Sequence, residues 1–107
     1  MNKAYAFFCR AFQGVFRAVL PILPYREPVQ LDGLASIVPL LREKAVSSVL
    51  LVTDAPVRSL GLTKLLEDAL KEASIACAVY DKTVPNPTIQ NIEEGRTLYL
   101  SSRAQAI

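Results

Sequence analysis

The sequence predicts an α/β fold with a parallel sheet, and three observations in residues 46–87 lead to this prediction. Val49–Val52 is a short apolar run bounded by polar residues, a pattern typical of a strand buried on both faces. Ile75–Tyr80 is a second such run, and the residues between the two runs have apolar positions at helical spacing. A strand, a helix and a strand with short connections form a Rossmann-like βαβ unit, in which the strands are parallel and the crossover is right-handed.

The composition sets limits on the kind of site that these residues can form. The chain has 107 residues, enough for one small domain, and its net charge of +2 does not indicate a nucleic-acid binder. Histidine is absent, which removes the commonest metal ligand and general base, so we assign no catalytic and no metal-binding residue. Cys9 and Cys77 follow no metal or redox spacing, and two lone thiols fit a reducing, cytoplasmic environment.

Residues 4–23 are rich in apolar and aromatic side chains and are expected to form an amphipathic helix. Lys3, Arg10 and Arg17 recur every seven residues and so form one basic stripe. The two arginines disfavour a transmembrane span, and they also interrupt the apolar core that a signal peptide needs. We expect the helix to pack on the parent protein or on a partner, with binding to a membrane surface as the alternative.

Three prolines, Pro21, Pro24 and Pro28, should end this helix and leave residues 20–28 extended. A short strand is expected at Val29–Leu31. We therefore place a boundary after residue 28, between an amphipathic extension (residues 1–28) and a domain formed by residues 29–107.

Two further helices and the start of a third strand complete the predicted elements. Before the first strand, apolar spacing predicts a helix that, because of Pro39, is as short as Val38–Lys44. After the second strand, Thr88 is a plausible N-cap for a helix over Ile89–Ser101, and a third strand is expected to begin at Ala104. The helix between the two strands is predicted from the following apolar residues: Leu62, Leu65, Leu66, Ala69, Leu70 and Ala73.

Two polar residues follow the predicted strands and are the candidate site residues. Asp54 stands at the end of the first strand, where an aspartate is often only a turn former or a helix cap. Asn86 lies between Pro85 and Pro87, which should fix an extended conformation there, and an asparagine in such a place is often only a turn residue.

Several motifs at these positions resemble the N-terminal nucleotide-binding domain of the iron-containing (group III) alcohol dehydrogenases. The matching segments are VLLVTD at 49–54, LGL at 60–62, KLLEDALKEA at 64–73, VYD at 79–81 and VPNPTIQNIEEG at 84–95. The resemblance covers residues 29–107, and residues 1–28 resemble the N-terminal extension of one subset of that family.

The resemblance implies a dehydrogenase that moves hydride between NAD and a primary alcohol or aldehyde. In that family a second, helical domain holds a divalent metal, usually iron, through one Asp and three His, and a GGGS loop that binds the pyrophosphate follows the strand corresponding to Ala104. Since this sequence has neither GGGS nor histidine, we expect a truncated N-terminal half of a dehydroquinate synthase-like/alcohol dehydrogenase fold, inactive alone and with weak or no NAD binding. The full-length parent is expected to act on small alcohols or aldehydes. A homo-oligomer is one candidate for its assembly state.

Two residues match the family's functional positions. The resemblance places Asp54 near the adenosine ribose hydroxyls, where a carboxylate favours NAD over NADP, and it places Asn86 beside the cofactor. Two alternatives stay open at this point. One alternative to the alcohol dehydrogenase interpretation is a non-enzymatic interaction module whose N-terminal helix docks on a partner or a membrane. The other is a relative of the polyol dehydrogenases or of dehydroquinate synthase.

Overall fold

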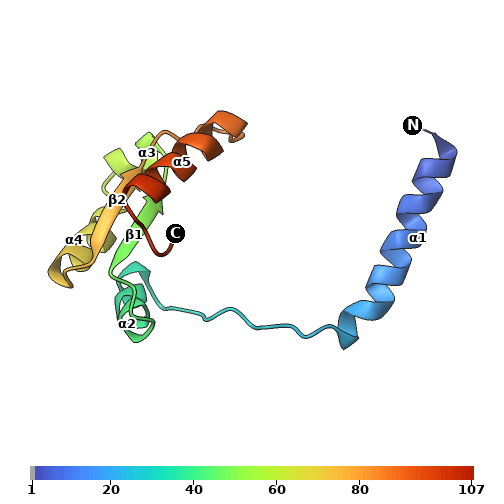
Figure 1. Ribbon diagram of the computed structural model, residues 1–107, viewed down its shortest axis with the longest axis horizontal. Helices are drawn as coiled ribbons and strands as arrows, with labels where there is room; N and C mark the ends of the chain where they lie inside the picture. The colour runs from blue at the N-terminus through green and yellow to red at the C-terminus, as the bar shows by residue number, and fades with distance from the viewer. Residues whose placement is uncertain (1) are drawn as a thin grey trace. The chain divides into compact units, whose positions relative to one another are not determined.

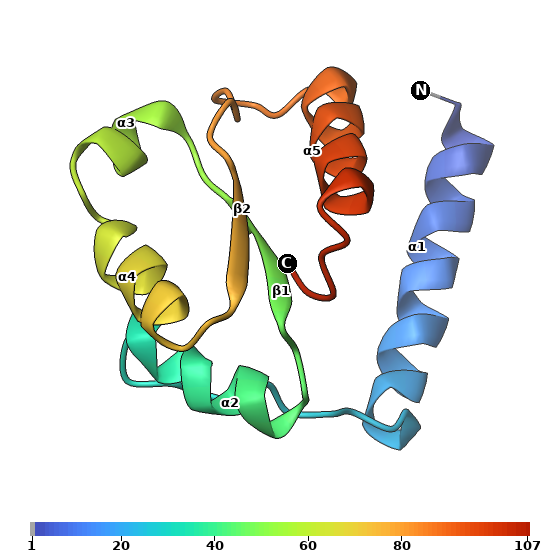
Figure 2. The same ribbon diagram turned by 60° about the vertical axis from the view of Figure 1, so that its left-hand side comes forward.

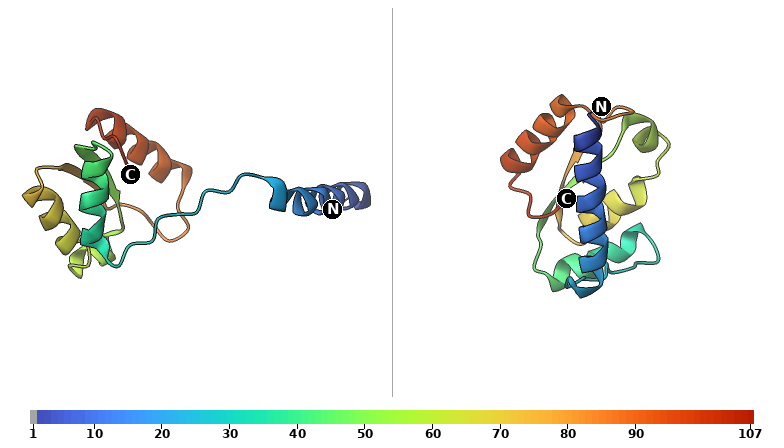
Figure 3. Two further views of the ribbon diagram at one scale, coloured as in Figure 1. Left: turned by 90° about the horizontal axis from the view of Figure 1, so that it is seen from below. Right: turned by 90° about the vertical axis from the view of Figure 1, so that its right-hand side faces the viewer.

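The computed structural model describes residues 2–107 and divides the chain into two units, of which one ends at Gln30 and the other is Leu31–Ile107. The first unit contains helix α1 (Lys3–Val19), a continuous helix (Figure 3), and a 3-10 turn, η1 (Leu20–Ile22). The predicted N-terminal helix is therefore confirmed. The prediction that the chain is extended from Leu20 was wrong, because η1 continues the helical path and includes Pro21, which is tolerated in a first turn.

The second unit is an α/β structure with a parallel two-stranded sheet (Figure 1). Strand β1 pairs with β2 from Ser48 opposite Ala76 to Val52 opposite Tyr80, as the βαβ prediction required. The elements in order are η2 (Leu34–Ser36), α2 (Ile37–Glu43), β1 (Ser48–Val52), α3 (Ala55–Ser59), α4 (Lys64–Glu72), β2 (Ala76–Tyr80) and α5 (Ile89–Ser101).

Helices cover both faces of the sheet, with α4 and α5 on opposite sides (Figure 2). Neighbouring residues of a strand point to opposite faces, so Val49 joins one core cluster and Leu50 the other. The cluster on the α2 and α4 side consists of Val38, Leu41, Val49, Leu66, Leu70 and Ile75. The cluster on the α5 side consists of Leu50, Tyr80 and Ala104, with Leu98 and Tyr99 packed against it.

The end of the chain lies beside β1 (Figure 2) and forms a parallel bridge in which Ala106 pairs with Val49. Ser48 and Leu50 bond to this segment, whereas Ser47 and Thr53 bond to β2, so the segment occupies the opposite edge of β1. The amide N–H of Leu50 lies 2.9 Å from the Ala106 carbonyl oxygen. The expected third strand at Ala104 is thus represented by this bridge, and β1 is the central strand.

Three helices end in the same motif without a glycine. The residues after the C-caps of α2, α4 and α5 have positive φ, namely Ala45 (55°), Ser74 (59°) and Arg103 (53°). After α2, the Val46 amide bonds to the Leu41 carbonyl at 2.9 Å, which is the long hydrogen bond of a Schellman motif. Left-handed φ is costly for residues other than glycine. The corresponding amide hydrogen bonds of Val46, Ile75 and Ala104 stabilise the three turns.

Two other details of the sequence-based prediction were wrong. Val29–Leu31 is not a strand, because it has no pairing partner among the described residues and Val29 is 66% exposed. The sequence analysis also predicted no helix at Ala55–Ser59, which forms the short helix α3. The short helix predicted at Val38–Lys44 agrees with α2, in which Pro39 lies in the first turn.

Candidate functional site

Asp54 caps a helix at the carboxyl end of the central strand. Its side-chain oxygen Oδ1 accepts a hydrogen bond from the Val57 amide at 2.7 Å and so caps α3. The residue is half-buried, and no donor within residues 2–107 bonds to its other oxygen, Oδ2. An ionised carboxylate has about four acceptor positions, so the capping role leaves Asp54 able to accept from a ligand.

Asn86 lies at the tip of the loop between β2 and α5 and does not have the extended conformation expected from its proline neighbours. Its φ is 57°, in the left-handed region. The chain bends at Pro85 and Asn86, and asparagine adopts this conformation more readily than most non-glycine residues. Asn86 is exposed, and the hydrogen bonds of the described residues do not engage its side-chain amide.

Asn91, which the sequence analysis did not single out, holds this loop in place. Its Oδ1 accepts from the amides of Thr88 (3.3 Å) and Val84 (3.4 Å), and its Nδ2 donates to the Lys82 carbonyl at 3.2 Å. Thr88 in return accepts from the Asn91 amide at 3.2 Å, which completes a capping box at the start of α5. A polar residue three positions after the predicted cap Thr88 was the signal that could have identified it.

The fold brings the region of Asp54 and the loop that carries Asn86 to the same end of the sheet. The backbone of Asp54 forms an antiparallel bridge with Lys82, and the amide of Thr53 bonds to the Tyr80 carbonyl at 2.8 Å. The chain leaves β1 over the α4 face and leaves β2 over the α5 face (Figure 2). In open α/β sheets, ligands bind outside the carboxyl ends of strands where the connections diverge in this way.

An apolar groove of about 390 Å³ lies between the sheet and α5, next to this end. Thr83 and Pro87 of the loop line it, whereas Asp54 and Asn86 do not. The hydroxyl oxygen of Thr83 is buried and has no hydrogen-bond partner among the described residues. The other lining residues are Leu50, Val52, Tyr80, Asn91, Ile92, Gly95, Arg96, Tyr99 and Ile107.

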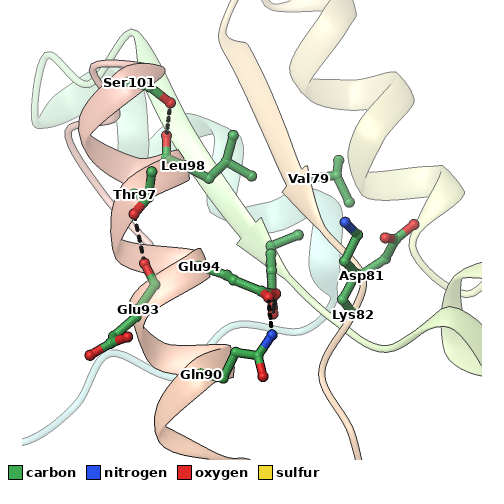
Figure 4. A pocket seen from close by; sticks show the side chains of 10 residues that line it. Val79, Asp81, Lys82, Gln90, Glu93, Glu94, Thr97, Leu98 and Ser101 are labelled. Carbon is green, nitrogen blue, oxygen red and sulfur yellow. Dashed lines mark hydrogen bonds between the residues drawn. The ribbon is translucent and has the colours of Figure 1, made fainter.

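A second, polar groove of about 500 Å³ is lined by the end of β2 and by α5 (Figure 4). Its acidic side chains Asp81, Glu93 and Glu94 disfavour phosphate groups, so it does not suit a dinucleotide. The Tyr80 hydroxyl donates to Glu94 at 2.6 Å, which raises the pKa of Tyr80 and lowers that of Glu94. This bond joins the end of β2 to α5, so Tyr80 and Glu94 have a structural role in the polar groove.

Arg58 connects α3 to the rest of the second unit. Its guanidinium donates to Asp81 at 2.8 Å and to Glu67 at 3.2 Å, so it joins α3 to the end of β2 and to α4. The bond from Arg58 lowers the pKa of Asp81 below its usual value. Because Asp54 caps the same short helix, Arg58 helps to fix the position of the Asp54 carboxylate.

Residues 2–107 contain no group of three or more His, Cys, Asp or Glu side chains placed to hold a metal ion. The described part of the chain therefore does not fit the iron that the family resemblance implies. In the same part of the chain, no helix combines the length and apolar character needed to cross a membrane.

The topology defines the class of an α/β unit with a parallel sheet and helices on both of its faces. A family profile described as iron-containing alcohol dehydrogenase matches residues 29–107, which is most of the chain. The chain therefore belongs to the iron-containing alcohol dehydrogenase family.

Curated relatives and solved structures agree with this assignment. Alcohol dehydrogenase 4 of Saccharomyces cerevisiae is 36% identical over 55 residues, which is 51% of this chain and 14% of the relative. Lactaldehyde reductase of Escherichia coli is 33% identical over 64 residues, which is 60% of this chain and 17% of the relative. The chain thus spans about a sixth or less of the length of these relatives.

The fold likeness extends to an archaeal halo-thermophilic alcohol dehydrogenase from a Red Sea brine pool, solved as a single-residue mutant. The TM-score is 0.56 over 79% of this chain and 24% of that chain, at 19% sequence identity. At this identity the likeness concerns the fold, and it supports the mixed α/β architecture with its parallel sheet.

Proposed function

We propose that this chain forms part of the NAD-binding region of an alcohol dehydrogenase that interconverts primary alcohols and aldehydes. The observation that supports this most is the position of Asp54 at the carboxyl end of the central strand. Its Oδ2 accepts no hydrogen bond from residues 2–107 and is available to a ligand. The family assignment and the names of the relatives, alcohol dehydrogenase and lactaldehyde reductase, support the reaction class.

The roles proposed for the two site residues follow from their chemistry. Asp54 accepts hydrogen bonds from the adenosine ribose hydroxyls through Oδ2, while Oδ1 keeps its bond to the Val57 amide. A 2′-phosphate would be repelled by this carboxylate, so the site prefers NAD to NADP. Asn86 presents its amide beside the cofactor from a loop that Asn91 holds in place, which lowers the ordering cost of binding.

The described residues bind and orient the cofactor in this proposal and perform no chemical step themselves. NAD supplies the hydride acceptor, and in the resembling family a metal polarises the alcohol oxygen. Because residues 2–107 contain no group of side chains that fits a metal, we propose no hydride transfer by these residues alone. Cys9 and Cys77 are free thiols, in accord with a reducing, cytoplasmic setting, which is likewise proposed.

Calorimetry with NAD and with NADP tests the proposal. Two polypeptides are compared, residues 1–107 and the same chain extended through any GGGS loop encoded downstream, and the extended chain is expected to bind NAD more tightly. Asp54→Asn keeps a capping side chain but removes the charge, so it should weaken NAD binding and reduce the preference over NADP. Asp32→Asn, an exposed change with the same effect on net charge, is the control.

Two results would contradict the proposal. One is the absence of NAD binding by both polypeptides when circular dichroism shows that they are folded. The other is an Asp54→Asn variant whose affinities for NAD and NADP equal those of the unchanged chain.

A further inference from the structure

Helix α1 has two chemically distinct sides, and none of its residues is buried. Successive residues of an α-helix are rotated by about 100°, so Lys3, Arg10 and Arg17 fall within an arc of about 40°. Phe8 and Phe12 lie on the opposite side and are 65% and 62% exposed.

The apolar side of α1 is broad and aromatic. It extends over about half of the helix circumference, from Phe7 through Phe12 to Cys9, and includes Phe8 and Phe16. The rings of Phe12 and Phe16 stack with centroids 6.2 Å apart. A coiled-coil seam is narrower and uses aliphatic residues at every third and fourth position. The width and the aromatic content of this side are instead those of a helix lying in a membrane interface.

The charge of the segment points in the same direction. All charged residues of α1 are basic, and the first acidic residue of the chain is Glu27, which comes after the helix. Anionic lipid headgroups attract such a basic face, and the long Lys and Arg side chains can reach the headgroups while the rings enter the acyl boundary.

We propose that α1 binds to the surface of membranes that contain anionic lipids, with its axis parallel to the surface. The Phe8–Phe12–Phe16 side enters the boundary between headgroups and acyl chains, and Lys3, Arg10 and Arg17 stay at the headgroups. In this proposal the helix lies on the bilayer and does not cross it. This inference does not depend on NAD binding.

Vesicle flotation with the full chain tests the proposal. Vesicles of phosphatidylcholine mixed equally with phosphatidylglycerol should carry the chain upward, and vesicles of phosphatidylcholine alone should not. High salt should weaken the binding, because it screens exposed charges. The chain has no tryptophan, so Phe12→Trp adds a single fluorophore whose emission should shift to shorter wavelength on binding.

Two double variants separate the basic stripe from net charge. Each cation near an anionic surface strengthens binding about fivefold, so Arg10→Gln with Arg17→Gln should weaken it by roughly 25-fold. Arg42→Gln with Lys44→Gln, at exposed positions of the second unit, changes the net charge equally and should have no such effect.

Several results would overturn the proposal. These are no flotation with the anionic vesicles, equal flotation with both kinds of vesicle, or equal losses in the two double variants. The proposal would also be overturned if the chain did not bind vesicles and formed a dimer in analytical ultracentrifugation that Phe8→Ser abolishes. The apolar side would then be covered by a second copy of the chain.

Discussion

Asp54 has two roles in this account, and substitutions can separate them. The cap bond from the Val57 amide to Oδ1, at 2.7 Å, is lost in Asp54→Ala and can be replaced in Asp54→Asn. Losing an N-cap typically costs about 1 kcal/mol, whereas aspartate and asparagine cap about equally well. In a domain of this size, 1 kcal/mol lowers Tm by roughly 4–8 °C. Asp54→Ala should therefore melt several degrees below the unchanged chain, and Asp54→Asn should melt close to it.

The assay combines thermal unfolding followed by circular dichroism with NAD titration of the same samples. Both variants should lose NAD affinity because both lack the carboxylate, although only Asp54→Ala loses stability. Equal melting temperatures for Asp54→Ala and the unchanged chain would refute the capping argument. Unchanged NAD affinity in the well-folded Asp54→Asn variant would refute the cofactor role.

Four further predictions follow from particular contacts. Leu70 is the most deeply buried side chain, 1% exposed, so Leu70→Ala should cost about 2–5 kcal/mol in urea unfolding, and a cost below 1 kcal/mol would contradict the described core. Ala45→Gly should stabilise the chain by about 0.5–1 kcal/mol in the same assay, because it relieves a left-handed φ of 55°, and destabilisation would contradict that strain. Asn91→Ala should increase amide hydrogen exchange at residues 83–88, and an unchanged exchange rate there would show that other contacts hold the loop. Arg58 lowers the pKa of Asp81 in the folded chain. The pair therefore stabilises the fold at pH values above the pKa that Asp81 has in the unfolded chain, and this contribution is lost as the pH falls through its pKa in the folded chain. In an NMR titration Arg58→Gln should raise the pKa of Asp81, and an unchanged pKa would contradict the pairing.

The elements with strong local patterns were predictable from the sequence. The strand at Val49–Val52 and the helix at Ile89–Ser101 have clear boundaries, and the structure places β1 and α5 there. The parallel pairing followed from the short connections of a βαβ unit, and the family resemblance was confirmed by the match over residues 29–107.

Features that depend on tertiary context were harder to predict. Helix α3 is only five residues long and depends on the Asp54 cap, so it has no apolar periodicity of its own. Asn86 adopts a left-handed φ because the chain bends between β2 and α5, and this overrides the preference that Pro87 imposes on the residue before it. The helix ends at Ala45 and Ser74 lack the glycine that usually marks such a turn.

The candidate site was predictable in position and only partly in content. Asp54 and Asn86 follow strands in the sequence, and the bridge between Asp54 and Lys82 brings their segments to one end of the sheet. The bond of Asn91 to the Thr88 amide has a local signal, its spacing from the predicted cap. Its bonds to Tyr80, Lys82 and Val84 depend on tertiary contacts that no local pattern displays.

The most direct test of the central claim is an NAD titration of the isotopically labelled chain followed by NMR, which detects weak binding residue by residue. The account predicts chemical-shift changes at Asp54 and Asn86 and in the loop at residues 83–88, with smaller changes when NADP replaces NAD. It would be contradicted if neither residues 1–107 nor the extended chain, both folded, responded to NAD, or if the shifts were confined to the polar groove of Glu93 and Glu94.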